Sequence, residues 1–213
     1  MTYSAPHEIE KRSFEIIREE LARLCGGQQG GEIKRSALEE AVLIRVIHTS
    51  ADFDYRKNLV FTRGAAQAGR DLLRAGAWVV TDTKMALAGV SKRSLAQYGG
   101  EARCFIADPD VAGRAGVDGT TRARAAVDKA AQLPGPLIFA VGNAPTALMR
   151  MRELYDEGRF TPGMVIAAPV GFVNVEESKE RCMDLPLPCV IALGRKGGSA
   201  IAAAILNALL HAE

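Results

Sequence analysis

The stretch LIFAVGNAPTALMRMRELYDEGRFTPGMVIAAPV, residues 137–170, decides the fold class. It opens and closes on short runs that are apolar on both faces, at 137–142 and 164–170, and the segment between them has a helical pattern. Pro145 suits the first turn of that helix, and Gly158 suits its carboxyl end. Two such runs joined by a helix are typical of parallel strands in a sheet that helices cover on both faces.

The same alternation continues on both sides of this stretch. Further apolar runs occupy 77–82, 102–107 and 189–194, and helix-length segments separate them. Together with the two runs above they predict an α/β fold, a three-layer sandwich built on a five-stranded parallel sheet. No internal repeat or linker divides the chain. We therefore expect one domain, 1–213, with a helical amino-terminal segment at 7–49 and an α/β body at 64–213.

Two helices are expected ahead of the sheet. In the segment 8–24, apolar residues recur at spacings of three and four, which predicts one apolar stripe that packs against the body. The residues of this stripe are Phe14, Ile17, Leu21 and Leu24. Ser36 is an N-cap candidate with Glu39 three residues later, so a second helix should start there and run to about His48.

Composition excludes several classes of protein. The chain has 213 residues, enough to bury a core without disulfides, and its formal net charge of +2 does not indicate a nucleic-acid surface. No stretch approaches the ~20 apolar residues of a membrane span, and no signal peptide is recognisable. The four cysteines form no CxxC pair and have no histidines at metal-ligand spacing. We expect a cytoplasmic protein with no bound metal, no nucleic-acid partner and no membrane partner.

A ligand is expected where the parallel strands end, because open α/β sheets bind ligands outside the carboxyl ends of their strands. The loop GRKGGS, 194–199, is the strongest candidate. Gly197 and Gly198 let backbone N–H groups approach a ligand, and Arg195 and Lys196 add positive charge at a helix start, which favours an anion. A tight turn with solvated basic residues explains the loop equally well. It fits neither the Walker nor the GxGxxG pattern, so a nucleotide is not expected.

His48 is the histidine best placed for chemistry. It ends an apolar helix, the polar and aromatic segment TSADFDY follows it, and imidazole changes charge near neutral pH. A structural role for His48 remains open, and Asp52 and Asp54 either orient it or cap and turn the chain. No GxSxG or HExxH motif is present, so neither a hydrolase nor a metalloenzyme is indicated.

Six long segments span nearly the whole chain in order: RSFEIIREE (12–20), RVIHTSADFDY (45–55), TDTKMALAG (81–89), GNAPTAL (142–148), PVGFVNVEESKE (169–180) and GRKGGSAIAAAILNAL (194–209). RVIHTSADFDY followed by GNAPTAL is far more specific than any single glycine loop. Together these segments resemble the precorrin-8X methylmutase family of cobalamin biosynthesis.

This resemblance implies a flavodoxin-like fold, a homodimer, and no metal or organic cofactor. It also implies a reaction in which the methyl group at C-11 of the tetrapyrrole migrates to C-12. Precorrin-8X would give hydrogenobyrinic acid, and cobalt-precorrin-8 would give cobyrinic acid. The family's catalytic histidine falls on His48, as the acid that protonates the macrocycle. A rearrangement of this kind needs only an acid and a pocket that holds one reactive form of the substrate.

The resemblance further implies a set of substrate-binding residues. The substrate carries many carboxylates around an apolar ring, and helix N-termini and basic side chains are suited to hold such a rim. The candidates are Ser13, Thr83, Arg122, Asn143, Lys179, Arg195, Lys196, Gly197, Gly198 and Ser199.

Two other functions compete with this one. A different isomerase or transferase would bind a small phosphorylated or polycarboxylate substrate in the same crevice, and a ligand screen would distinguish it. A corrinoid carrier would bind the ring without transforming it. Because the product of a methylmutase closely resembles its substrate, only turnover separates a carrier from the enzyme.

Overall fold

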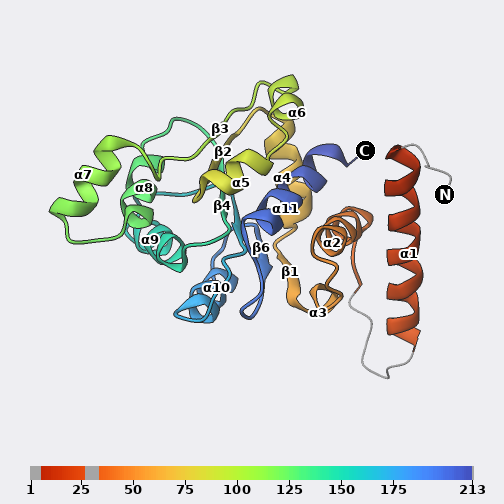
Figure 1. Ribbon diagram of the computed structural model, residues 1–213. Helices are drawn as coiled ribbons and strands as arrows, with labels where there is room; N and C mark the ends of the chain where they lie inside the picture. The colour runs from red at the N-terminus through yellow and green to blue at the C-terminus, as the bar shows by residue number, and fades with distance from the viewer. Residues whose placement is uncertain (1–5, 27–33, 213) are drawn as a thin grey trace.

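The computed structural model describes residues 6–26 and 34–212 (Figure 1). The helices in these residues are α1 Pro6–Gly26, α2 Ala37–Ser50, α3 Tyr55–Asn58, α4 Ala65–Arg74, α5 Lys84–Gly89, α6 Lys92–Gln97, α7 Pro109–Val117, α8 Arg122–Ala130, α9 Pro145–Asp156, α10 Val175–Met183 and α11 Ser199–His211. The strands are β1 Leu59–Thr62, β2 Trp78–Thr81, β3 Ala102–Arg103, β4 Leu137–Val141, β5 Met164–Ala167 and β6 Cys189–Ala192.

All the strands of the described chain belong to one six-stranded sheet, in the order β1-β6-β5-β4-β2-β3. The α/β fold class is confirmed, and each of the five predicted runs contributes a strand. These five strands are parallel to one another, whereas β1 pairs antiparallel with β6, Leu59 lying opposite Ala192 and Thr62 opposite Cys189.

The prediction of five strands was therefore wrong by one, because β1 was missed. This strand lies at an edge of the sheet, where only Leu59 is buried and the next three residues are partly exposed. It thus lacks the continuous apolar run by which the inner strands were recognised. The opposite edge strand, β3, is also shorter than predicted: it pairs with β2 over two residues, so the run at 102–107 mostly forms a loop.

Helices cover both faces of the sheet. In Figure 1, α7, α8, α9 and α10 lie on one side, and α2, α4 and α11 lie on the other. Alternate strand residues face the two layers: Ile166 and Val190 belong to the hydrophobic cluster with α11, and Val165 and Ile191 to the cluster with α9. Helix α11 packs between the sheet and α2, since the apolar residues along most of it are buried.

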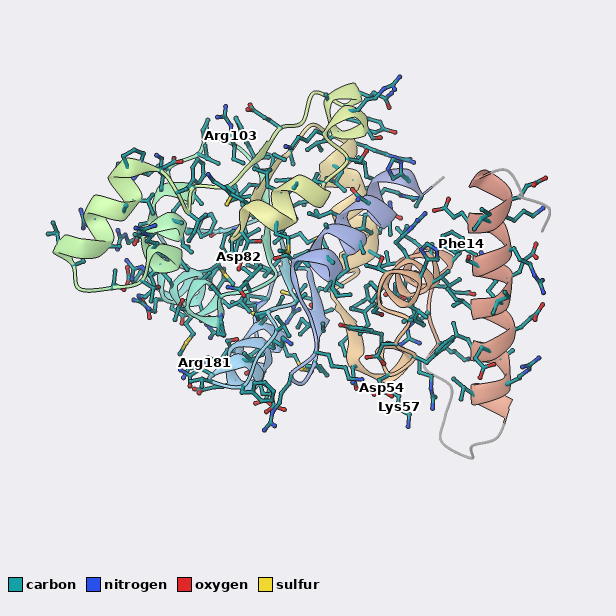
Figure 2. All side chains as sticks on the ribbon, viewed as in Figure 1. Phe14, Asp54, Lys57, Asp82, Arg103 and Arg181 are labelled. Atoms are coloured by element: carbon teal, nitrogen blue, oxygen red, sulfur yellow. The ribbon has the colours of Figure 1, made fainter. Side chains whose placement is uncertain are left out.

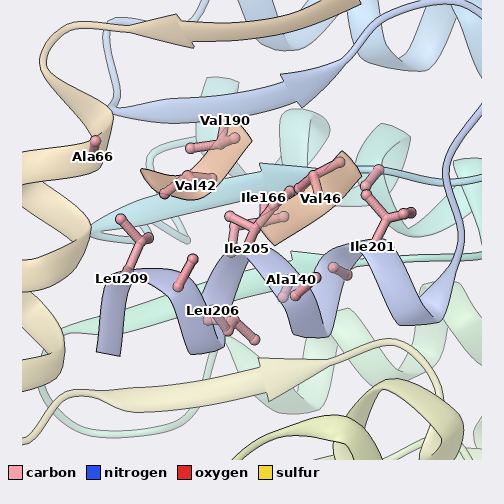
Figure 3. Close-up of a cluster of buried hydrophobic side chains, with 14 of the residues drawn as sticks. Val42, Val46, Ala66, Ala140, Ile166, Val190, Ile201, Ile205, Leu206 and Leu209 are labelled. Atoms are coloured by element: carbon pink, nitrogen blue, oxygen red, sulfur yellow. The ribbon is translucent and has the colours of Figure 1, made fainter. Parts of the chain in front are cut away.

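Figure 3 shows this part of the core, where side chains of α2, α11 and the strands gather: Val42, Val46, Ala140, Ile166, Val190, Ile201, Ile205 and Leu209.

The two amino-terminal helices form as predicted. Ser36 and Glu39 make the reciprocal hydrogen bonds of a capping box at the start of α2. The stripe on α1 contacts the core: Ile17 is buried, and Phe14 and Leu21 pack against the same cluster. Helix α1 thus lies along α2, at the side of the molecule far from α7 (Figure 1). No helix in the described ranges is long and apolar enough to cross a membrane.

Candidate active site

The loops that follow β2, β4, β5 and β6 lie at one edge of the sheet, because these four strands are parallel. Three of the loops meet at Ser199, the first residue of α11. Its hydroxyl oxygen lies 2.7 Å from that of Thr83, which also caps α5 by accepting a hydrogen bond from the N–H of Ala86. Gly142 packs so closely that a Cβ there would lie 2.6 Å from the Cα of Ser199. The structure therefore brings Thr83 and Ser199 together with the start of the loop GNAPT, residues 142–146, called the GNAPT loop below.

The glycines of the GRKGGS loop allow it to pack closely on the loop after β5. The N–H of Gly198 donates a hydrogen bond to the carbonyl of Ala168 at 2.8 Å, and Gly198 has φ 130°. A Cβ on Gly197 would come within 2.6 Å of the carbonyl oxygen of Pro169. The sequence analysis expected Gly197 and Gly198 to let the backbone approach a ligand. In the structure these glycines instead let the backbone approach the loop that follows β5.

Lys179 lies beneath the same loop. It belongs to α10, is 0% exposed, and donates hydrogen bonds to the carbonyls of Gly194 at 2.7 Å and Lys196 at 2.8 Å. Burial lowers the pKa of the Lys179 ammonium to about 8. This predicted binding residue therefore contacts the backbone of the loop from the protein interior.

The two basic side chains of the loop are exposed, and both already have partners. The Lys196 ammonium lies 2.6 Å from a carboxylate oxygen of Asp52 and 2.5 Å from one of Asp54, which raises the pKa of Lys196. Arg195 donates to Glu176 at 3.2 Å, and its guanidinium lies 5.4 Å from the ring centroid of Phe172. Lys196 thus joins the GRKGGS loop to the segment that follows α2.

The role of Asp52 and Asp54 is now clearer. Asp52 accepts a hydrogen bond from the N–H of Asp54 at 3.0 Å, as a turn residue does, and both carboxylates bind Lys196. These contacts favour a structural role in turning and tying the chain over direct orientation of His48.

His48 occupies the last turn of α2 and is exposed. Its ring packs edge-to-face against Phe14 of α1, with 5.3 Å between ring centroids, and the Arg45 guanidinium lies 4.7 Å from the same phenyl centroid. Ser13, the neighbour of Phe14, donates its hydroxyl to the carbonyl of Ile9 at 2.8 Å. Ser13 and His48 therefore come from the two amino-terminal helices, and the bridge from Lys196 to the chain just after His48 connects them to the loop edge.

Arg122 and Asn143 are both exposed. Arg122 is the first residue of α8, directly after Thr121, whose hydroxyl oxygen lies 3.2 Å from that of Thr146 in the first turn of α9. Asn143 precedes the same helix by two residues. The structure thus places both candidates near the start of α9.

Asp82 was not predicted as a site residue, although it lies in the TDTKMALAG segment, 81–89. It is 4% exposed, and its carboxylate accepts hydrogen bonds from the backbone N–H groups of Gly142, Asn143 and Ala144 at 2.8, 2.9 and 2.8 Å. Burial raises the pKa of this carboxyl, while the three N–H donors act in the opposite direction. Asp82 is labelled near the centre of the view in Figure 2. A carboxylate directly after a buried strand was the signal that could have revealed it.

Two surface hollows lie elsewhere. One of about 630 Å³ is lined by charged side chains of α7, α8 and α9, among them Arg114, Lys129 and Arg150, and one of about 590 Å³ lies between α2 and α4. Neither hollow contains a predicted site residue. Among the residues that the structure describes, no group of three or more His, Cys, Asp or Glu side chains is placed to hold a metal ion.

Comparison with known proteins assigns the family. The family model for precorrin-8X methylmutase (CbiC) matches residues 8–212. Cobalt-precorrin-8 methylmutase of Salmonella typhimurium is 46% identical over 207 residues, which cover 97% of this chain and 95% of that protein. Precorrin-8X methylmutase of Pseudomonas aeruginosa is 37% identical over 203 residues, covering 94% and 93%. A crystal structure of precorrin-8X methylmutase from Thermus thermophilus, 38% identical, superposes with a TM-score of 0.82 over 95% of each chain. The chain therefore belongs to the precorrin-8X methylmutase family.

Proposed function

We propose that this chain moves the methyl group from C-11 to C-12 of the tetrapyrrole in precorrin-8X or cobalt-precorrin-8. It is a methylmutase, and so an isomerase of cobalamin biosynthesis. The observation that carries this proposal is the family match over 8–212, together with relatives of both substrate names that align with nearly the whole chain. The products are hydrogenobyrinic acid from precorrin-8X and cobyrinic acid from cobalt-precorrin-8.

His48 is the proposed catalytic acid. Its imidazole is exposed at the end of α2, so a ligand can contact it, and Phe14 packs against the ring at a right angle. Protonation of the macrocycle draws electron density from the conjugated system and lowers the barrier to methyl migration. A positioned acid contributes about 10²- to 10⁴-fold to such a step. The chain's own residues thus supply the acid and a fixed surface around it.

The rim of the substrate is proposed to lie over the edge of the sheet where the loops after β2, β4, β5 and β6 lie, called the loop edge. Exposed cations suit its carboxylates, and hydroxyl, amide and backbone N–H groups suit the remaining acceptors. Lys179 supports this surface from the protein interior, since both of its hydrogen bonds hold the backbone of the GRKGGS loop, called the basic loop below. The proposed binding residues are Ser13, Thr83, Arg122, Asn143, Arg195, Lys196, Gly197, Gly198 and Ser199, with Lys179 in this supporting position.

We further propose that residues 1–213 act as one cytoplasmic methylmutase domain of the flavodoxin-like type, without a cofactor. The order of the five parallel strands supports the fold type. Numbered along the chain among themselves they lie as 2-1-3-4-5, which is the flavodoxin order.

The working unit is proposed to be a homodimer. The site residues lie on an open edge, and an apolar group of Val170, Phe172 and Val173, 47%, 81% and 77% exposed, projects beside Arg195. A broad macrocycle on such an edge needs a cover, and a second copy related by two-fold symmetry supplies one. Sedimentation at micromolar concentration should show a dimer. Monomers alone, with activity unchanged on dilution, would count against it.

The direct experiment is incubation of the purified chain with precorrin-8X and, separately, with cobalt-precorrin-8, followed by the visible spectrum. A methylmutase converts at least one of them to the spectrum of the corrin product. Binding of the product without turnover of either substrate would indicate a carrier. Binding of neither ring, with binding of a small phosphorylated or polycarboxylate compound, would indicate a different enzyme in the same crevice.

A further inference from the structure

We propose that Asp82 is a positioning residue for methyl migration, which holds the GNAPT loop and Asn143 in a fixed place beside the start of α11. This inference rests on the proposed function. Asp82 itself does not reach the substrate, because it is 4% exposed and both carboxylate oxygens bond to backbone.

The carboxylate occupies the place where a bound anion would lie at a helix start. Its Oδ1 accepts the N–H of Gly142, and its Oδ2 accepts those of Asn143 and Ala144, the three residues that lead into α9. These N–H groups are therefore unavailable to a substrate carboxylate. The GNAPT loop is left to meet the substrate with the exposed side chain of Asn143.

Thr83, the residue after Asp82, makes hydrogen bonds at the starts of two more helices, α5 and α11. Thr83 caps α5 and lies 2.7 Å, hydroxyl to hydroxyl, from Ser199 at the start of α11. Gly142 in turn packs on the backbone of Ser199. Asp82 and Thr83 thus hold the starts of α5, α9 and α11 in one unit, and release of the GNAPT loop changes how Asn143 sits relative to the basic loop.

The geometry requires a carboxylate. Three N–H donors are shared between two acceptor oxygens, and an amide has only one such oxygen. Asp82→Asn keeps the shape of the side chain but turns an NH₂ group toward at least one backbone N–H, whichever way the amide is oriented. The buried donors left without a partner move to find one. We therefore expect the GNAPT loop to shift in this variant while β4, the strand that leads into it, stays in place.

The test compares Asp82→Asn with Ile138→Val, a fully buried substitution in β4 that shortens the core side chain without touching the loop. Melting temperature, KM and kcat are measured for both variants and for the parent. Partial unfolding reduces the amount of active enzyme, so it lowers the apparent kcat and leaves KM unchanged. A displaced binding loop raises KM.

We expect Asp82→Asn to raise KM by about 10-fold, the factor that corresponds to the loss of roughly one hydrogen bond to the substrate, and Ile138→Val to keep the parental KM. A parental KM in folded Asp82→Asn overturns the proposal. If the parent chain itself converts neither substrate, the proposed function fails instead, and the two failures are distinguishable.

Ala144→Pro covers the case in which Asp82→Asn does not fold. Proline lacks the N–H, so this variant removes one of the three donors and keeps the carboxylate, while the φ of −96° at Ala144 has to tighten toward the roughly −65° that the proline ring imposes. KM should rise in the same direction by a smaller factor. An unchanged KM in this variant overturns the proposal as well.

Discussion

Two lysines in different regions of the molecule make the same ion-pair geometry. In the site triad, Lys196 lies 2.6 and 2.5 Å from Asp52 and Asp54; in the flank triad, Lys129 lies 2.7 Å from both Asp108 and Asp110. Each aspartate pair is separated by one residue, in DFD and in DPD. The exposures also match, at 28% and 68% for the site aspartates and 36% and 64% for the flank aspartates.

The triads differ in what they connect. The flank triad joins α8 to the start of α7, and the residues beneath it belong to the apolar core of that side. The site triad joins the basic loop to the turn after His48, and the backbone carbonyl of Lys196 is itself held by buried Lys179. Equal ion pairs should therefore contribute equally to stability and unequally to function. The same comparison supplies a matched control for each change at the site.

The largest difference is expected for catalysis. His48→Ala should lower turnover by about 10²- to 10⁴-fold, because the proposed proton donor is lost, while product binding and melting temperature stay close to those of the parent. Lys129→Ala, in the flank triad, should turn over substrate at the parental rate. The measurement is the rate of corrin formation at saturating substrate. Loss of activity in both variants would mean that the loss in His48→Ala does not report on the proton donor.

The next difference is expected for binding of the polyanionic ring. The double variant Arg195→Ala/Lys196→Ala should weaken affinity for the product by about 10- to 100-fold at low salt, since charge-assisted hydrogen bonds to the rim are lost. The parent should lose affinity as ionic strength rises, and the double variant less so. Titration followed by absorbance gives both values. If the Lys129→Ala control weakens binding as much, net charge rather than the basic loop explains the effect.

A smaller effect, on stability, is expected for Lys179, which holds the backbone carbonyl of Lys196 from the protein interior. The pKa of Lys179 in the folded chain is about 8, below the ~10.4 of an unfolded lysine, so its buried charge costs stability below pH 8. As pH rises from 8 toward 10, the folded state loses this proton before the unfolded state does. The parent should therefore gain about 1–3 kcal/mol relative to Lys179→Met between about pH 7 and 10. The neutral amine still donates to both carbonyls.

Urea unfolding of the parent and of Lys179→Met at the two pH values measures this gain. A stability difference between them that does not change with pH would mean that Lys179 carries no depressed pKa. Lys129→Met is the control, since its exposed triad should show no such gain over the same range.

The smallest effect is the loss of stability when the lysine of either triad is removed, and it should be the same for both triads. Lys196→Ala and Lys129→Ala should each shift the melting temperature by no more than about 3 °C, because exposed ion pairs contribute little net stability. A calorimetric scan of the two variants beside the parent checks this. A much larger shift for Lys196→Ala alone would mean that the site triad holds the fold together as well as the site.

The sequence predicted the inner strands because each is an apolar run buried on both faces, as Ile166 and Val190 are. It missed β1, whose edge position leaves an unremarkable pattern in LVFT. It also identified the loop edge through Gly197, Gly198 and the basic pair. What it could not supply were contacts between distant residues, such as Asp82 with the GNAPT backbone or Lys179 with the basic loop, because burial of a charged group depends on which backbone atoms surround it.

The role of His48 as the catalytic acid is tested most directly by the rate of methyl migration in His48→Asn, measured beside the parent from about pH 5 to pH 9. Asparagine keeps a hydrogen-bond donor and gives up the titratable proton, so the variant isolates acid catalysis from contact with the ring. Acid catalysis by His48 predicts a rate about 10²- to 10⁴-fold below that of the parent where the parent is most active, with product affinity retained. Turnover at the parental rate across the whole range would contradict it, and the geometry of the pocket alone would then have to explain the reaction.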